Sequence, residues 1–573
     1  MPTYGQRPDD VVQDSRGNTL TGVTIALYAT EGGATAGGTP LGTAVTDKRG
    51  RWGYAAGDGE VWARLPDGTV WQVAPPRGAT KIEHDSEVAA RQADTATRVA
   101  KGELVYNVKD YGAKVDGATA DHAAYQAAIN AAFTAGGGTV YSPPGTAIFG
   151  AKVMMKSGVR LLGAGPASVI KRAASYTGID RLLGVENVTG VTVEHLTLDG
   201  NRYAFGANLT ANIGIYSSDN VQLTSVRSVD AYGDGFYLEW VGGAHNANVR
   251  MLNCSANNNL RQGLSVCDVT TFRAVACIFT GSNGAAPQAG VDVEPSGAGA
   301  NCADVEFTGC EMSSNAGPGF TVNLSTTPGG VQGDIRVSSS RMRGNASSGI
   351  NLLTAYRVSL VDVLAEGNAH GLLCSDNVTD LTVIGGSYSR NLTHGIFWVA
   401  PLGGNMKVIG ASVRNNSVTA ANTSHGIRIQ GTVAGVLVQG CSVGNDGATG
   451  QAYGITTAGS TQTGVRLLGN DFTGNQTGAA LLSDDGTTRR VRSNRAFENI
   501  GTFVAQPAVA ASGTNVTNTT GYDCTVHIWG GTYTDVLINN QTIGGPATTV
   551  RVPAGQQIKL TYTVAPTWKW VGE

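Results

Sequence analysis

The sequence predicts an all-β protein organised around a single-stranded parallel β-helix, and three observations carry this prediction. A glycine followed by an apolar residue returns eleven times between Gly214 and Gly478, a repeat of about 26 residues that is typical of stacked repeat proteins. Apolar and polar residues then alternate, as in Val291–Glu294, which is the period of a strand and not of a helix. Asparagines precede many of these glycines, and both residue types tolerate positive φ. Each repeat is therefore expected to be a tight bend that leads into a strand. These asparagines are Asn259, Asn315, Asn345, Asn368, Asn391 and Asn475.

Composition narrows the classes of function. The 573 residues include 80 glycines without a collagen period, and the net charge is −3. Nucleic-acid binding needs clustered Lys and Arg, so no nucleic-acid partner is expected. No apolar run approaches the ~20 residues that cross a bilayer, so no membrane insertion is expected. The first residues lack the apolar segment of a secretory signal, so no secretory signal is expected. If the protein acts outside a cell, release by lysis as part of a virus particle is one route.

Residues 1–79 are predicted to form a small antiparallel β domain. Strand-like runs at 22–28, 60–65 and 69–73 are separated by Asp-Gly and Gly-Gly turns. The segment resembles the Ig-like sandwich modules that begin many phage tail proteins, which implies attachment to the virion. A generic β-sandwich without that role is the alternative.

Residues 80–104 are predicted to form a helical neck. Ala89, Ala93, Ala96 and Ala100 are spaced by four and three residues, which gives a narrow seam through which several copies could pack closely. A single helix that lies on the next domain is the alternative interpretation.

Residues 503–573 are predicted to form a C-terminal β-sandwich, because the repeat stops and strand-like runs appear at 515–529 and 549–562. The segment resembles C-terminal modules on tail proteins of phages that infect actinobacteria. Trimerisation and glycan binding are both open as its role.

A motif at the start of the repeat region gives the most specific resemblance. Tyr106–Asp121, Ala123–Ile129 and Gly136–Gly145 closely resemble the opening of pectate-lyase-like right-handed parallel β-helix proteins, a group that includes phage tailspikes and tail-associated depolymerases. The resemblance implies a β-helix over residues 105–502 and a helix at about 121–135 that caps the first coil. Such a cap covers backbone groups that would otherwise be unpaired. Two short departures from the family pattern, at 115–117 and 121–123, concern the cap and not the chemistry. The motif indicates fold and not reaction.

Polar side chains between the buried positions are expected to form ladders on one face of the β-helix. Three carboxylates concentrate there, and two tyrosines, an arginine and an aspartate lie close to them. Carboxylates beside aromatic rings suit a sugar, because the rings take its apolar face and the acids act on the glycosidic bond. The alternative is a set of solvated acids on the rod surface. The predicted catalytic residues are Asp292, Glu294 and Glu239, and the predicted substrate-binding residues are Tyr216, Tyr237, Arg261 and Asp234.

The predicted chemistry is glycoside hydrolysis. Asp292 and Glu294 are two residues apart on one strand, hence ~6.6 Å apart, which fits inversion better than retention. Glu294 would act as general acid and Asp292 as base, while Glu239 would raise their pKa values by repulsion. A lyase is less favoured, because lysines are scarce on this face. Binding without cleavage remains an alternative.

Two histidines add a weaker candidate. His394 and His425 each precede a repeat glycine and are expected to stack on adjacent coils. Two histidines without a clear third ligand indicate turn residues more than a metal site. No metal and no other cofactor is expected.

The sequence as a whole predicts a phage tail-associated receptor-binding protein or tailspike that recognises, and in one version cleaves, a bacterial surface polysaccharide. The expected assembly is a homotrimer at the tail tip of the virion that acts at the outer surface of the host. Residues 1–104 would bind other tail or baseplate proteins. The alternatives are a free bacterial polysaccharide-degrading enzyme and a non-catalytic structural fibre.

Overall fold

The computed structural model divides into two compact units, residues 1–98 and 99–573. In residues 1–104 it describes the backbone of four strands. It describes residues 105–572 apart from 177–180, 205–209, 241, 298, 325–329, 400–401, 431, 448, 458–461, 483–489, 497–505, 521–522 and 544–548. The predicted neck lies outside the described residues.

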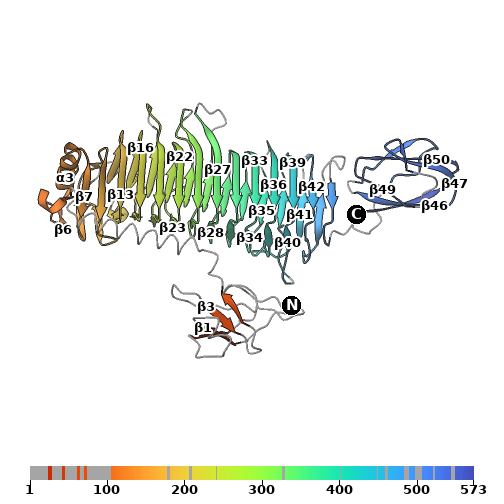
Figure 1. Cartoon of the computed structure of the whole chain (residues 1–573), viewed down its shortest axis with the longest axis horizontal. Helices are drawn as coiled ribbons and strands as arrows, with labels where there is room; N and C mark the ends of the chain where they lie inside the picture. Colours follow the sequence, from red (N-terminus) through yellow and green to blue (C-terminus); the bar gives the residue numbers. More distant parts are fainter. Residues whose placement is uncertain are drawn as a thin grey trace. The chain divides into compact units, whose positions relative to one another are not determined.

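The second unit contains a parallel β-helix, as predicted (Figure 1). The β-helix has three faces, and a full coil contributes one strand to each of them. Strands on equivalent positions of successive coils pair in parallel. The longest sheet has 15 strands: β5 (Val105–Asn107), β7 (Gly138–Ser142), β10 (Val159–Gly163), β13 (Thr189–Glu194), β16 (Asp219–Thr224), β19 (Ala247–Leu252), β22 (Val269–Val275), β25 (Cys302–Thr308), β27 (Gln332–Ser338), β30 (Ala355–Val361), β33 (Asn377–Ile384), β36 (Leu402–Ile409), β39 (Ala434–Gln439), β42 (Arg466–Leu468) and β44 (Arg490–Arg492).

Most of the repeat glycines, such as Gly263 and Gly290, directly precede a strand of a 13-stranded sheet. Its strands are β9 (Val153–Met154), β12 (Leu183–Glu186), β15 (Ile213–Tyr216), β18 (Phe236–Glu239), β21 (Leu264–Val266), β24 (Val291–Val293), β26 (Phe320–Val322), β29 (Ile350–Leu352), β32 (Leu372–Cys374), β35 (Ile396–Trp398), β38 (Ile427–Ile429), β41 (Tyr453–Thr457) and β43 (Gly478–Leu482).

The third face is divided into a seven-stranded and a five-stranded sheet, which isolated bridges through Glu311 join. The seven strands are β6 (Asp116–Ala120), β8 (Gly145–Phe149), β11 (Ser168–Arg172), β14 (Thr197–Asp199), β17 (Arg227–Val229), β20 (Ser255–Asn257) and β23 (Ile278–Thr280). The five are β28 (Arg341–Arg343), β31 (Leu364–Glu366), β34 (Ser387–Ser389), β37 (Ser412–Arg414) and β40 (Ser442–Gly444).

One α-helix, α3 (His122–Thr134), packs against β5, β7 and β9 at the start of the β-helix, within the span expected for the cap. The side chain of Asp121 accepts hydrogen bonds from the backbone N–H groups of Lys114 and Val115, at 2.7 and 3.0 Å. Two short 3-10 helices, η1 (Val108–Tyr111) and η2 (Arg202–Ala204), complete the helical content of the described residues. Within that part of the chain, no helix has the length and apolar character to cross a bilayer.

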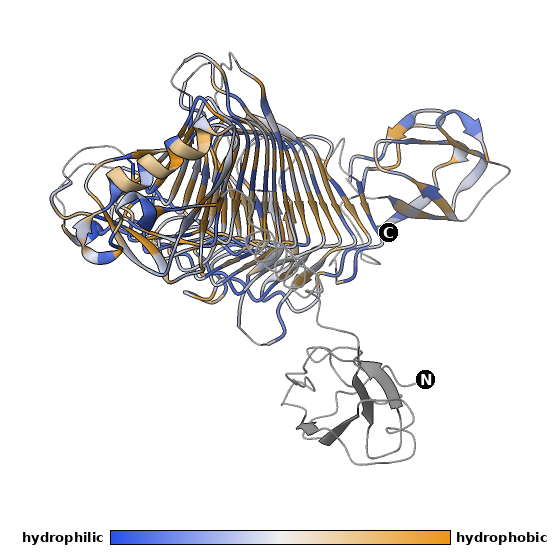
Figure 2. Ribbon diagram, turned by 60° about the vertical axis from the view of Figure 1, so that its left-hand side comes forward, coloured by the Kyte–Doolittle hydropathy of each residue, from blue (hydrophilic) through white to orange (hydrophobic). Residues whose placement is uncertain are grey.

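The core of the β-helix consists of apolar side chains that alternate with outward residues along each strand. Val291 and Val293 of β24 are fully buried, as are Ile350 and Leu352 of β29. The same alternation recurs on successive strands, so hydrophobic positions form bands along the coils (Figure 2). Parallel pairing thereby places the apolar side chains of one coil against those of the next coil.

The glycines and asparagines of the repeat have roles other than the predicted one. Gly263 and its equivalents are absent from the positive-φ residues. A Cβ at Gly263 would lie 2.5 Å from the carbonyl oxygen of Gly290 on the next coil, so close approach of the coils requires glycine. The asparagines also have ordinary φ, and those that are buried bridge coils. The side-chain amide of Asn345 donates to Asn368 Oδ1 at 2.9 Å and to the Met312 carbonyl at 3.0 Å.

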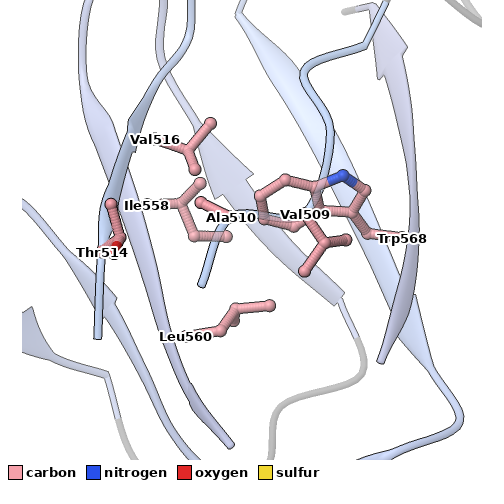
Figure 3. A pocket seen from close by; sticks show the side chains of 7 residues that line it. All are labelled: Val509, Ala510, Thr514, Val516, Ile558, Leu560 and Trp568. Atoms are coloured by element: carbon pink, nitrogen blue, oxygen red, sulfur yellow. The ribbon is translucent and has the colours of Figure 1, made fainter. Parts of the chain in front are cut away.

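The C-terminal strands form two antiparallel sheets, β45-β50-β47-β48 and β49-β46-β51. Their bounds are β45 (Asn515–Thr517), β46 (Cys524–Trp529), β47 (Thr532–Ile538), β48 (Gln541–Thr542), β49 (Thr549–Val552), β50 (Gln557–Val564) and β51 (Thr567–Gly572). Side chains from both sheets and the preceding segment converge on a small apolar recess (Figure 3). It is lined by Val509, Ala510, Thr514, Val516, Ile558, Leu560 and Trp568. With one hydroxyl among seven side chains, this recess is the packing interior of the domain.

The first unit contains one four-stranded antiparallel sheet in the order β2-β1-β3-β4. Its strands are β1 (Thr24–Tyr28), β2 (Gly42–Val45), β3 (Val61–Arg64) and β4 (Val70–Val73). Any second sheet of the predicted Ig-like sandwich lies outside the described residues.

Candidate functional site

The predicted site residues lie on neighbouring coils, on the outward positions of the 13-stranded sheet and on the turns next to its strands. Strand pairing aligns Ser265 with Asp292, and Tyr237 with Ser265. One correction concerns Tyr216, which aligns with Glu239 and not with Tyr237. Gly214 therefore does not occupy the repeat-glycine position. Strand alternation has a period of two, so the pattern alone does not distinguish a strand from the same strand shifted by two residues.

Asp234 is the centre of a buried polar network. Its side chain is 5% exposed and accepts hydrogen bonds from Arg261 Nη1 at 3.1 Å, the Gln262 backbone N–H at 3.1 Å and Ser265 Oγ at 2.9 Å. Ser265 Oγ also lies 3.0 Å from Gln262 Oε1. Burial raises the pKa of Asp234, and Arg261 and the hydrogen bonds oppose this shift. Of the predicted substrate-binding residues, Asp234 and Arg261 are thus brought into direct contact.

Asp292 extends this network to the next coil. Gln262 Nε2 donates to its Oδ2 at 2.5 Å, while Oδ1 is buried without a hydrogen-bond partner among the described residues. The side chain is 4% exposed, so it is not one of the solvated surface acids of the alternative interpretation. Burial, and secondarily the charge of Glu294, raises the pKa of Asp292 to about 7. Repulsion from Glu239, the predicted cause, is not among the causes of this shift.

This protonation changes the roles that the geometry favours. A carboxyl group that keeps its proton near neutrality suits a general acid better than a base. Asp292 therefore fits the acid role, which the sequence pattern had assigned to Glu294. Glu294 is half-buried and lies 3.4 Å from the amide nitrogen of Asn323.

The two tyrosines lie beside the acids. The rings of Tyr216 and Tyr237 are 6.3 Å apart, and the guanidinium of Arg181 lies 3.9 Å from the Tyr216 ring centroid. Arg181 is also 3.9 Å from Glu239, whose side chain is 24% exposed. Tyr216 is almost fully buried, and its hydroxyl has no hydrogen-bond partner in the described part of the chain. Tyr237 is half-buried and is the ring that the surface presents.

Sequence reasoning missed a group at the end of β18. The rings of Trp240 and His245 stack at 5.3 Å. His245 Nδ1 lies 2.7 Å from Oδ1 of the fully buried Asp268, which fixes the orientation of the imidazole. Trp240 directly follows Glu239, so an aromatic residue next to a predicted acid was the available signal. Gln262 was missed because it lies on a turn and not on a strand.

The site contains no metal-binding arrangement among the residues with a described placement. There, no three His, Cys, Asp or Glu side chains are grouped so that they could hold a metal ion. The cluster offers the buried Asp292 carboxyl, whose pKa of about 7 lets it hold a proton up to neutrality. It also offers the half-buried carboxylates of Glu239 and Glu294 and the half-buried rings of Tyr237 and Trp240. These groups can donate a proton to an oxygen and bind the face of a sugar ring.

Comparison with known proteins gives matches to two kinds of β-helix protein. Residues 105–327 match the family model for rhamnogalacturonase A/epimerase, pectate lyase-like. The chain is 35% identical to mannuronan C5-epimerase AlgE4 of Azotobacter vinelandii over 148 residues, 22% of this chain and 27% of that protein. It is 33% identical to the preneck appendage protein of Bacillus phage PZA over 136 residues, 22% of this chain and 15% of that protein. The chain thus spans about a quarter or less of these curated relatives.

A solved structure extends the similarity over more of the chain. The Dettilon tailspike protein superposes with a TM-score of 0.50 at 13% identity, over 82% of this chain and 94% of the tailspike. At this identity the likeness concerns the fold alone. Residues 105–327 match the pectate lyase-like rhamnogalacturonase A/epimerase family model, and the chain has the parallel β-helix fold of pectate-lyase-like proteins, a fold it shares with phage tailspikes.

Proposed function

We propose that this chain recognises a bacterial surface polysaccharide on the outward face of the 13-stranded sheet, as a phage tail-associated protein. The observation that carries the proposal is the buried carboxyl network of Asp234 and Asp292, with Tyr237 beside it and Trp240 directly after Glu239. A buried acid with an unpartnered oxygen costs stability. Its place beside aromatic rings fits a ligand with many hydroxyl groups.

The relatives support the proposal from two directions. One is an epimerase of mannuronan, a polysaccharide, and another is a phage appendage protein. The structural neighbour is a tailspike. A polysaccharide-binding β-helix on a phage tail accounts for both kinds of similarity. A free bacterial enzyme is the second candidate, and the match to the epimerase favours it.

Cleavage is the finer part of the proposal. Asp292 would protonate the leaving oxygen, and Glu294 would activate water, so that one bond to the anomeric carbon breaks and one forms. Tyr237 would hold the sugar. Binding without cleavage uses the same surface and needs no proton transfer.

The test is incubation of the full chain with purified envelope polysaccharide from the host, with binding and polymer length both followed. Asp292→Asn and Glu294→Gln should abolish shortening and retain binding. Asp304→Asn, on the 15-stranded sheet, is the matched control and should leave both unchanged. Shortening that persists in both site variants would refute the assignment of the acids. Absence of binding by the wild type would refute the function itself.

Assembly and location are tested separately. We propose a homotrimer in the virion tail, attached to other tail or baseplate proteins through residues 1–104. Light scattering should give three times the 58.9 kDa chain mass. Antibodies against residues 1–98 should label the tails of purified particles in electron micrographs. A monomer mass, or unlabelled tails, would contradict the respective proposal and favour the free enzyme.

A further inference from the structure

A second polar cluster lies on the same sheet, several coils beyond Asp292. His370, His394 and His425 precede Gly371, Gly395 and Gly426, so they occupy the coil position that Asp234 and Gln262 hold earlier. The rings of His370 and His394 stack at 5.8 Å and 4°, and those of His394 and His425 at 5.4 Å and 28°. The predicted stacking of His394 and His425 is thus present in the structure, with a third histidine added.

The proton of His394 is fixed by the backbone. Its Nδ1 lies 2.9 Å from the backbone N–H of His425 and accepts that hydrogen bond. A neutral imidazole with an accepting Nδ1 carries its proton on Nε2. Burial, together with the charges of His425 and Arg428, lowers the pKa of His394 to about 3. Near neutrality, therefore, His394 Nε2 is a hydrogen-bond donor.

That donor faces a second donor. Arg428 Nη1 lies 3.4 Å from His394 Nε2, and neither group can accept. Arg428 Nε is buried and has no hydrogen-bond partner among the described residues, and no carboxylate there forms an ion pair with Arg428. Two donors converge where an acceptor is missing. An oxyanion in contact with both donors would satisfy them, as carboxylates commonly do for guanidinium groups.

An aromatic ring adjoins these donors. The Phe397 ring lies 4.7 Å from the His394 ring, and the Arg428 guanidinium carbon lies 5.3 Å from the Phe397 centroid. Phe397 is half-buried and pairs in register with Arg428 on the next strand. The ring thus offers an apolar surface of the kind on which sugar rings pack.

We propose that His394, Phe397 and Arg428 form a second saccharide site that is specific for a sugar unit bearing an oxyanion. The oxyanion lies against His394 Nε2 and the Arg428 guanidinium, and the sugar ring lies against Phe397. The site is separate from the Asp292 cluster, and its ligands are acidic saccharides. The proposal of this site does not depend on the hydrolysis proposed for the Asp292 cluster.

The test is calorimetric titration of the full chain with defined probes. The probes are a uronic-acid hexasaccharide, the same hexasaccharide with its carboxyl groups reduced to alcohols, a glycerol-phosphate-linked oligosaccharide and inorganic phosphate. We expect Arg428→Gln to weaken binding of an acidic oligosaccharide roughly tenfold or more, because a charge-assisted hydrogen bond is lost. The neutral hexasaccharide should be unaffected by this change.

Matched variants separate the site from general charge. Arg357→Gln removes one positive charge from the 15-stranded sheet, where Arg357 pairs with Asp334, and should leave acidic binding unchanged. Asp304→Asn, which removes an exposed negative charge from the same sheet, should also leave it unchanged. Arg428→Lys, which keeps the positive charge and loses the planar guanidinium with its several N–H donors, should give an intermediate affinity. Thermal unfolding confirms that each variant is folded.

Each outcome decides the proposal. Preference for the uronic-acid probe identifies a carboxylate ligand, and preference for the phosphate-linked probe identifies a phosphorylated glycan; both support the site. Equal affinity for acidic and neutral hexasaccharides overturns it, as does unchanged acidic binding in folded Arg428→Gln. Binding of inorganic phosphate alone, or of no probe at millimolar concentration, also overturns it.

Discussion

The acidic network around Asp234 and the histidine cluster around His394 occupy equivalent positions on one sheet, yet their hydrogen bonds balance differently. Asp234 accepts from three donors of the protein. At the other cluster, His394 Nε2 and Arg428 Nη1 are both donors and face one another. The same backbone thus carries one network that is nearly closed and one that lacks an acceptor. The open network is where a ligand adds most, because its partners are already desolvated.

Burial favours the neutral form of the side chains in both clusters, and it shifts the pKa values of the acids and of the histidines in opposite directions. It raises the pKa of Asp292 to about 7, and it lowers the pKa values of His394 and His425 to about 3 and about 4. Stability should therefore respond to pH in opposite directions at the two clusters. The predictions below use that contrast, in order of decreasing expected effect.

Loss of the hub of the closed network should have the largest effect. Asp234→Ala leaves the Arg261 guanidinium and the Gln262 backbone N–H without their acceptor, which should lower the free energy of unfolding by about 3–5 kcal/mol. Chemical denaturation measures this value. Asp304→Ala breaks an exposed ion pair with Arg273 and should cost less than about 1 kcal/mol. Equal costs for the two variants would show that the network contributes no more than a surface pair.

Asp292 should make the folded protein less stable as the pH rises. Its folded pKa lies above the unfolded value of 3.8, so its contribution is fully present below about pH 4 and is lost as the pH rises through about 7. The free energy of unfolding of Asp292→Asn, minus that of wild type, should rise by on the order of 4 kcal/mol between pH 4 and pH 8. Denaturation series at several pH values measure the difference. A pH-independent difference would show that Asp292 titrates normally.

His394 should act in the opposite direction. Its folded pKa lies below the unfolded value of 6.5, so its contribution is present above about pH 6.5 and is lost as the pH falls toward 3. The free energy of unfolding of wild type, minus that of His394→Asn, should be about 2 kcal/mol lower at pH 5 than at pH 8. The same denaturation series tests this. A loss that is retained in His394→Asn would assign the acid sensitivity to other groups.

The two arginines give the smallest and most selective contrast. Arg261→Gln removes a hydrogen-bonded partner of Asp234 and should lower the free energy of unfolding by about 1–2 kcal/mol. Arg428→Gln removes a group without an acceptor and should change it by less than about 0.5 kcal/mol. Thermal midpoints at pH 7 compare the two directly. A larger loss from Arg428→Gln would mean that the histidine cluster is closed by a partner of its own.

Much of the fold could be predicted because its determinants are local and repeated. The glycine spacing and the motif at 106–145 both indicate a β-helix, and the parallel sheets follow from them. The physical reason for the glycines was not predictable from the repeat alone. Positive φ and close approach both select glycine, and the backbone angle of Gly263 and its distance to the next coil are needed to distinguish them.

The sequence could predict that some of the site residues lie together, and it could not predict their environment. Asp234, Arg261 and Asp292 do lie together, because parallel pairing stacks equivalent positions. Their hydrogen-bond network depends on Gln262, a turn residue whose side chain donates to Asp292 on the following coil. Trp240 and His245 lie beyond the repeated strand and follow no period. Exposure and pKa therefore had to come from the three-dimensional structure.

The asparagine ladder bears on how such a rod changes length in evolution. Asn345 bonds to the coil before it and to the asparagine of the coil after it, and Asn368 repeats the arrangement with Met342 and Asn391. A duplicated coil brings its own amide, which accepts from one neighbour and donates to the next. Within the run from Asn315 to Asn391, duplication or deletion of a whole coil thus leaves no amide orphaned in the core. The ladder is interrupted where Ser282 takes the asparagine position, and there Asn259 Nδ2 has no hydrogen-bond partner among the described residues. Within that run the number of coils can change while the buried amides remain hydrogen-bonded. Under the proposed function, such a change would alter the number of sugar units that the β-helix can span.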